Sequence, residues 1–117
     1  MDQPQTHGDV ALPAIVLTGE IDLAVAPVLE ARLERLRSEG ATTIVVDLLR
    51  ATFLDSIALG VLVDVLGQCR EAGGDLYLVV DEPRILKVLE ITGLSDIFAL
   101  YPSYEILDRN VEEVPLP

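Results

Sequence analysis

The stretch Phe53-Leu-Asp-Ser-Ile-Ala-Leu-Gly60 joins the end of a strand-like segment to the start of an apolar, helix-like segment. An acidic residue and a hydroxyl residue, Asp55 and Ser56, stand at this junction. Strand-to-helix junctions often form binding sites, because the first amides of a helix have no partner inside the helix and can bind a phosphate or a side chain of a partner. This junction is therefore the first candidate for a functional site.

The segments around the junction alternate between two kinds of pattern. Short runs of apolar and β-branched residues at 14–18, 43–48 and 76–80 predict buried strands, and a shorter run at 98–101 predicts another. Between them, apolar residues recur every three or four positions, which predicts amphipathic helices ending at Gly40, Gly73-Gly74 and Gly93, and a further helix from Ser103. Such alternation predicts a largely parallel α/β sheet with right-handed crossovers.

The length and composition indicate one domain. The chain has 117 residues, half of them hydrophobic (50%), which is enough to form a core. Residues 1–9 are polar, and residues 109–117 contain two glutamates and two prolines. We therefore expect a flexible N-terminal segment at 1–9, a domain at 10–108 and a flexible C-terminal tail at 109–117.

The charge of the chain limits its partners. Twenty acidic residues against eight basic ones give a net charge of −12, which opposes binding to nucleic acid or to anionic lipid. The longest apolar run, 57–66, is interrupted by Asp64 and is shorter than the roughly 20 residues that span a membrane. With one cysteine and no apolar leader pattern, the chain is expected in the cytoplasm, with a protein or a cation as its partner.

The residue inventory argues against an enzyme. The only histidine, His7, lies in the N-terminal segment, so a histidine-based triad or a metal site is not expected. No glycine-rich phosphate loop is present, so no cofactor is predicted. Lys87 is expected to face solvent rather than to serve a phosphate-accepting receiver domain, and Cys69 is expected in the core. Asp64 and Asp75 are expected to be solvated.

Several pieces of the sequence together resemble the STAS domain of the anti-sigma factor antagonist family. They are Leu17-Thr-Gly-Glu-Ile-Asp22, Ile44-Val-Val-Asp-Leu48, the stretch from Phe53 to Gly60, Gly73-Gly-Asp-Leu76, and Leu94 after Thr92-Gly93. The resemblance covers residues 14–107. It implies a single STAS-like domain with a four- or five-stranded, largely parallel or mixed sheet and about four helices. It also implies a bacterial regulator of transcription without enzyme activity of its own.

The resemblance further implies a partner and a switch. In that family the antagonist binds an anti-sigma factor, usually a small serine kinase that uses ATP, and a sigma factor is thereby released. Phosphorylation by the kinase ends the complex. The family motif runs Asp-Ser-Ser/Thr-Gly/Ala-Leu-Gly, and its second hydroxyl accepts the phosphate. The residue at that position here is Ile57, which has no oxygen to phosphorylate.

Ser56 is an alternative phosphate acceptor, one residue earlier. A shift of one residue near a helix start turns the side chain by about 100° around the helix axis, so a kinase that fits one position fits the other poorly. We therefore favour loss of the usual switch. Ser56 has an equally strong structural interpretation as the helix N-cap, which stabilises a helix by about 1 kcal/mol.

We expect a docking surface for a protein partner at Asp22, Asp55, Ser56 and Ile57. Asp55 suits the positive end of a helix or a basic partner, and Asp22 suits a turn or a partner contact. Two other functions stay open: a module of a larger stress-signalling assembly that oligomerises through a sheet edge, and a sensor of a small ligand or nucleotide. Formation of a homodimer also stays open.

Overall fold

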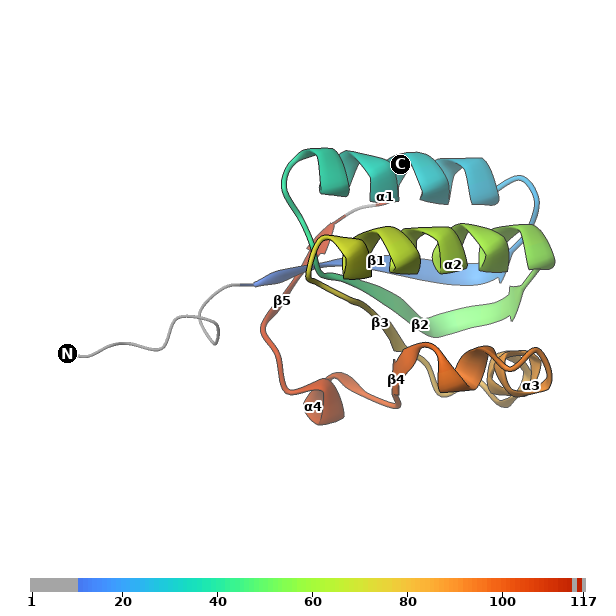
Figure 1. Ribbon diagram of the computed structural model, residues 1–117. Helices are drawn as coiled ribbons and strands as arrows, with labels where there is room; N and C mark the ends of the chain where they lie inside the picture. Colours follow the sequence, from blue (N-terminus) through green and yellow to red (C-terminus); the bar gives the residue numbers. More distant parts are fainter. Residues whose placement is uncertain (1–10, 115, 117) are drawn as a thin grey trace.

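The computed structural model describes residues 11–114 and 116. Within this part, five strands form one parallel sheet in the order β4-β3-β2-β1-β5 (Figure 1). The strands are β1 (Leu12–Ile21), β2 (Ile44–Leu54), β3 (Leu76–Val79), β4 (Ala99–Tyr101) and β5 (Val111–Val114). The helices are α1 (Ala26–Ser38), α2 (Ser56–Glu71), α3 (Pro83–Ile91) and α4 (Tyr104–Leu107), with a 3-10 turn at Leu94–Asp96. The predicted α/β fold is confirmed.

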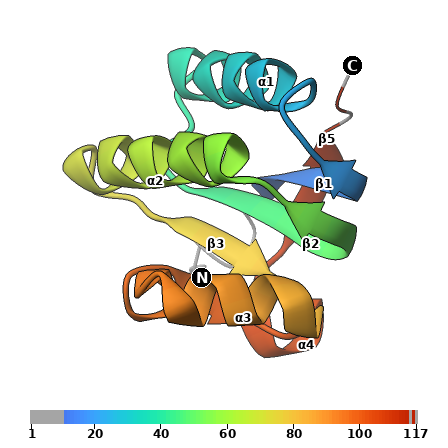
Figure 2. The ribbon, with the colours of Figure 1, turned by 90° about the vertical axis from the view of Figure 1, so that its right-hand side faces the viewer.

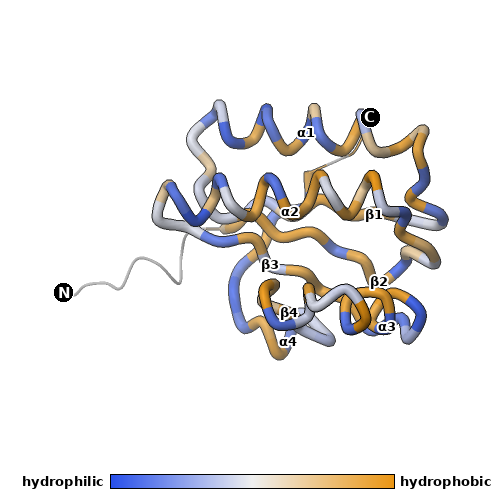
Figure 3. Tube along the Cα trace, turned by 45° about the vertical axis from the view of Figure 1, so that its right-hand side comes forward, coloured by the Kyte–Doolittle hydropathy of each residue, from blue (hydrophilic) through white to orange (hydrophobic). Residues whose placement is uncertain are grey.

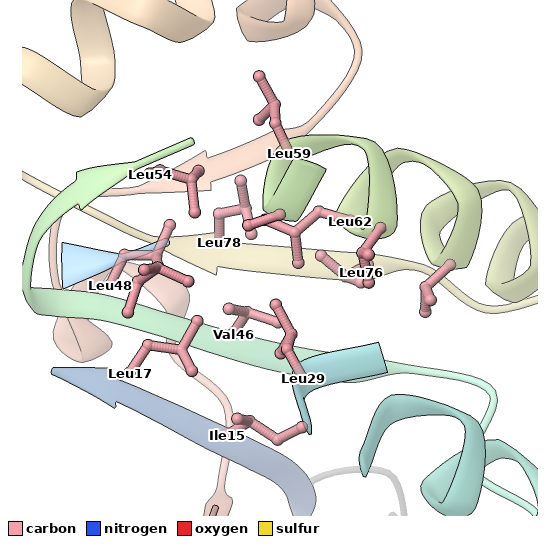
Figure 4. Packing of buried hydrophobic residues seen from close by; sticks show 14 of the residues in the cluster. Ile15, Leu17, Leu29, Val46, Leu48, Leu54, Leu59, Leu62, Leu76 and Leu78 are labelled. Atoms are coloured by element: carbon pink, nitrogen blue, oxygen red, sulfur yellow. The ribbon is translucent and has the colours of Figure 1, made fainter. Parts of the chain in front are cut away.

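Alternating side chains of the strands supply two cores, one on each face of the sheet. On the first face, apolar residues of β1, β2 and β3 pack against α1 and α2. Figure 4 shows Val46 and Leu48 of β2 on this side, near Leu29 of α1 and Leu62 of α2. On the opposite face, Val45 belongs to a smaller cluster. The first cluster contains many more buried residues than the second. Burial of each large apolar side chain contributes about 1.5–3 kcal/mol, so the first core contributes most of the hydrophobic stabilisation.

The helices follow the spacing of their apolar residues. α1 and α2 lie side by side over the first face of the sheet (Figures 1 and 2). In Figure 3 the tube of α2 alternates between apolar and polar colours, as expected for a helix with one buried face. α3 packs against β2 and the 3-10 turn, and α4 places Leu107 in the cluster on the second face.

The last strand lies in a segment whose sequence predicts a tail. β5 pairs with β1 in parallel register, Leu12 opposite Val111, and the Leu12 amide donates to the Asn110 carbonyl oxygen at 2.9 Å. The domain therefore extends beyond the expected end at residue 108, and an ordered strand replaces part of the predicted flexible tail at 109–117. Glu112 and Glu113 are exposed on this edge strand, so its sequence lacks the apolar run of a buried strand. The N-terminal segment predicted at 1–9 lies outside the described residues.

β2 is also longer than the predicted strand 43–48. Its pairing with β3 ends at Asp47 opposite Val79, whereas its pairing with β1 continues to Leu54 opposite Ile21. Polar Arg50 and Thr52 interrupt the apolar pattern of this extension. The extension carries the junction at residues 53–57 past the end of β3.

Candidate functional site

Two acidic residues lie side by side where neighbouring parallel strands end. Ile21 and Leu54 are paired as the last residues of β1 and β2, and Asp22 and Asp55 follow them directly. The Asp55 amide donates a hydrogen bond of 3.1 Å to the Ile21 carbonyl oxygen. Carboxyl ends of strands are where open parallel sheets present their ligand sites. The structure thus brings Asp22 and Asp55 to one corner.

Asp55 caps helix α2. Its backbone is extended, and its Oδ1 accepts a hydrogen bond of 2.9 Å from the Ala58 amide. The interpretation of Ser56 as the N-cap is therefore wrong: Ser56 is the first helical residue. The carboxylate one residue earlier reaches the amide that a serine cap would have taken. Ser56 consequently presents an exposed side chain beside the cap.

Asp22 shapes the entry to α1. Its Oδ1 accepts hydrogen bonds from the amides of Ala24 at 3.0 Å and Val25 at 3.3 Å. This is the turn chemistry anticipated for an aspartate at a strand end. The residue itself stays exposed, so its carboxylate is also accessible at the corner.

Large apolar side chains are exposed around these acids. Ile57 is 52% exposed in the first turn of α2, Phe53 is 49% exposed near the end of β2, and Leu23 is 64% exposed in the loop after β1. Figure 2 shows the ends of β1 and β2 toward the viewer, below the first turns of α1 and α2. Grouped exposed apolar residues with a polar rim mark interaction surfaces. We call Asp22, Leu23, Phe53, Asp55, Ser56 and Ile57 the corner surface.

Phe53 and Leu23 are not evident as site residues from the sequence. Phe53 lies between exposed Thr52 and buried Leu54, so the strand pattern alone does not tell which side of the sheet it faces. An aromatic residue in a chain with only 4% aromatic content is the available signal. The sequence does not single out Leu23, because one leucine between Asp22 and Ala24 resembles an ordinary loop residue.

A hollow of about 490 Å³ adjoins the corner surface. Phe53 belongs to both features, and α3 forms the other wall through Arg84, Ile85 and Val88. Arg84 is held at the hollow by Glu82, which accepts from its Nε at 3.3 Å and its Nη2 at 3.1 Å. The side-chain hydrogen bond from Arg84 lowers the pKa of Glu82. The positive charge that lines the hollow is therefore already paired.

A second polar feature lies on the opposite face of the sheet. Asp47 is buried in the middle of β2 and accepts hydrogen bonds from the Tyr104 hydroxyl at 2.6 Å and the Leu49 amide at 2.8 Å. Burial, followed by this bond to Asp47, raises the pKa of Tyr104. Both carboxylate oxygens of Asp47 accept hydrogen bonds from within the fold, and the bond from Tyr104 connects α4 to the sheet. Asp47 is therefore a structural residue.

Other residues considered in the sequence take structural or solvent positions. Cys69 is buried, as predicted, and burial raises the pKa of its thiol. Lys87 is exposed, as predicted. Asp64 is exposed, whereas Asp75 is partly buried and pairs with Arg70 at 3.1 Å, so Asp75 is not simply solvated.

A metal site requires clustered ligands, and a membrane-spanning helix requires a long apolar stretch. Residues 11–114 and 116 contain no cluster of three or more His, Cys, Asp or Glu residues placed to hold a metal ion. None of the helices in the same part of the chain is long and apolar enough to cross a membrane.

The sequence matches a family model along most of its length. The model of the STAS domain matches residues 3–106. The chain belongs to the STAS domain family. This STAS domain is 34% identical over 97 residues to the anti-sigma-B factor antagonist of Bacillus subtilis (strain 168), covering 83% of this chain and 85% of that protein. It is 33% identical over 88 residues to the anti-sigma-B factor antagonist of Staphylococcus aureus (strain NCTC 8325 / PS 47), covering 75% of this chain and 82% of that protein.

Solved structures show the same fold. The anti-sigma factor antagonist SpoIIAA in its unphosphorylated form superposes with a TM-score of 0.65 at 20% identity, covering 91% of this chain and 92% of that chain. An anti-sigma factor antagonist from Mycobacterium paratuberculosis superposes with a TM-score of 0.64 at 24% identity, covering 88% of this chain and 84% of that chain. These likenesses confirm the STAS fold of the five-stranded sheet.

Proposed function

We propose that this STAS domain is an anti-sigma factor antagonist that binds an anti-sigma factor of the serine-kinase type and thereby regulates sigma-factor-dependent transcription. It acts by binding and has no enzyme activity of its own. The observation that carries the proposal is the corner surface, where exposed Ile57 and Phe53 stand beside Asp22 and Asp55. The names of the two curated relatives support an anti-sigma factor as the partner.

The composition of the corner surface suits a protein partner. Exposed apolar residues gain free energy when a partner removes them from water, at about 25 cal/mol per Å². The flanking carboxylates favour a partner with basic residues and speed its approach. Both features match binding better than catalysis, which needs titratable groups with a defined reaction geometry.

The residue at position 57 alters the expected switch. Ile57 occupies the position of the family's phosphate acceptor and offers an exposed hydrocarbon side chain instead of a hydroxyl. Ser56 precedes it in the first turn of α2, about 100° away around the helix. The antagonist is therefore not switched off by phosphorylation at the usual position, and Ser56 is a poor substitute acceptor.

The proposal is tested by measuring binding to each serine-kinase-type anti-sigma factor of the source organism by isothermal titration calorimetry, with and without ADP. One of them is expected to bind the wild type, and Ile57→Arg is expected to abolish binding with an unchanged circular dichroism spectrum. Ile106→Arg is the matched control, because Ile106 is 60% exposed on α4, which packs on the face of the sheet opposite α2. If no anti-sigma factor binds, or if Ile57→Arg binds as wild type does, the proposal is wrong.

A further inference from the structure

The hollow beside the corner surface arises from the unequal lengths of β2 and β3. β3 ends at Val79 opposite Asp47, and no other described strand pairs with that side of β2 as it continues to Leu54. Helix α3 packs against β2, and residues of α3 and of this extension line the same hollow. A helix and a strand edge do not interlock as two paired strands do, so a space of about 490 Å³ remains between them.

The hollow has an apolar interior and a polar rim. Its floor contains Leu54 and Ile85, which are 4% and 1% exposed, and Phe53 and Val88 form its sides. Glu20, Thr52 and Arg84 complete the lining. A concave site of this kind holds an apolar group and uses a few polar atoms to orient it.

The charge around the hollow indicates what kind of group enters it. Glu20 lies on β1 opposite Phe53 of β2, and Asp22 and Asp55 follow the two strand ends. Among the described residues, none of these three carboxylates takes part in an ion pair, whereas Arg84 is paired with Glu82 at 3.1 Å. With Arg84 paired to Glu82, the carboxylates of Glu20, Asp22 and Asp55 leave negative charge beside the hollow, which favours a cationic group next to the apolar one.

We propose that the hollow receives an apolar side chain of the protein partner, and that a lysine or arginine next to it on the partner pairs with Glu20. This inference rests on the proposed function and extends the docking surface from the start of α2 to α3. Phe53 provides the continuity, because it belongs to the corner surface and to the wall of the hollow. An apolar anchor in a pocket, ringed by charge pairs, is the arrangement that carries most of the affinity in protein interfaces.

Binding of the anti-sigma factor is compared between Val88→Glu and Ile91→Glu. Val88 lines the hollow and is 36% exposed, whereas Ile91 is 72% exposed on the same helix and does not line it. Both variants add the same negative charge to α3, so an effect of charge alone moves both equally. Val88→Glu is expected to weaken binding by at least about tenfold and Ile91→Glu by less than about twofold.

The cationic part is tested with Glu20→Lys against Glu71→Lys. Glu71 ends α2 at the opposite end of that helix from the corner, and both variants change the net charge by the same amount. Glu20→Lys is expected to lower the association rate and its salt dependence more than Glu71→Lys does. Equal effects of these two variants overturn the pairing with Glu20.

Thr52→Arg gives a second measure of the hollow if Val88→Glu folds poorly, because Thr52 is exposed at the rim and its replacement both fills the space and repels a basic partner. Wild-type affinity in Val88→Glu or Thr52→Arg, together with loss of binding in Ile57→Arg, overturns the inference and leaves the proposed function standing. Absence of binding by the wild type overturns both.

Discussion

The Tyr104 hydroxyl donates a hydrogen bond of 2.6 Å to Oδ2 of buried Asp47, joining α4 to the centre of the sheet. This contact spans 57 positions of the chain and places a carboxylate where its neighbours are apolar. A buried carboxylate is tolerated only when its oxygens are hydrogen-bonded. Tyr104 therefore holds α4 and also makes Asp47 acceptable in the core.

Replacement of Tyr104 by phenylalanine is expected to lower the free energy of unfolding by about 1–3 kcal/mol, because Asp47 loses a donor and stays buried. Urea denaturation measures the change. Tyr77→Phe is the control. Tyr77 is half-buried on the same face, and its ring lies 5.5 Å from the ring of Tyr101, centroid to centroid. A phenylalanine keeps this contact, so the free energy of unfolding should fall by less than about 0.5 kcal/mol. Equal stability of Tyr104→Phe and wild type would contradict the role assigned to Asp47.

The same contact predicts a loss of stability at alkaline pH. The pKa of Tyr104 is raised in the folded state, by burial first and then by Asp47, with Glu113 adding to the rise and Arg50 opposing it. Above pH about 10, the unfolded tyrosine releases its proton while the folded one retains it, so stability falls as pH rises. The decline between pH of about 9 and about 11 should be steeper in wild type than in Tyr104→Phe, as measured by urea denaturation at each pH. Parallel declines would refute this assignment.

Substitutions of Asp55 separate its cap from its charge. Asn is as good an N-cap as Asp, so Asp55→Asn should stay within about 0.5 kcal/mol of wild-type stability, whereas Asp55→Ala should lose about 1 kcal/mol. Both remove the carboxylate from the corner surface. Binding of the anti-sigma factor should therefore weaken by about tenfold in both variants, equivalent to about 1.4 kcal/mol. Wild-type affinity in Asp55→Asn would show that Asp55 serves only the helix.

Phosphorylation is expected to follow the residue at position 57. Incubated with its kinase partner and ATP, the wild type should gain no phosphate by mass spectrometry, because Ile57 has no acceptor oxygen. Ile57→Ser should gain one phosphate, and a Ser56→Ala, Ile57→Ser double variant should still gain it. A phosphate on the wild type that disappears in Ser56→Ala would instead identify Ser56 as the acceptor.

Two glycines near the end of α2 should respond in opposite directions to alanine. A Cβ on Gly74 would overlap the backbone carbonyl of Thr42, so Gly74→Ala should cost about 1–3 kcal/mol of stability. Gly67 lies inside α2 with open space around it, so Gly67→Ala should add about 1 kcal/mol through helix propensity. Thermal unfolding ranks the two variants, and a Gly74→Ala protein as stable as Gly67→Ala would contradict the close approach of residue 74 to Thr42.

The sequence predicts the elements whose pattern is continuous and misses those whose pattern is broken. The burial of α2 and of the start of β2 can be predicted from their sequences. In a helix every third or fourth residue faces the core, and in a buried strand the apolar residues form a continuous run. β5 escapes prediction because Glu112 and Glu113 dominate a strand that lies at a sheet edge. The extension of β2 past residue 48 escapes it for a related reason, since Arg50 and Thr52 are exposed.

The candidate site is predicted in part. Asp22, Asp55, Ser56 and Ile57 come together because parallel strands bring their carboxyl ends to one edge. Asp55 rather than Ser56 is the cap because the helix begins at Ser56. Both residue types form N-caps, so the sequence alone does not show at which of the two the helix begins. The hollow depends on the difference in length between β2 and β3, a property of pairing that neither segment reveals alone.

The parallel pairing of β1 with β5 has a consequence for synthesis of the chain. The amide of Leu12 bonds to the carbonyl oxygen of Asn110, so β1 gains its second neighbouring strand only after residues 111–114 have been synthesised. At about 5–20 residues per second, that delay is roughly 5–20 s on the ribosome. Until then β1 is an open edge with unpaired backbone groups, a template for association with other nascent chains. The net charge of the full sequence, −12, adds electrostatic repulsion that opposes such association.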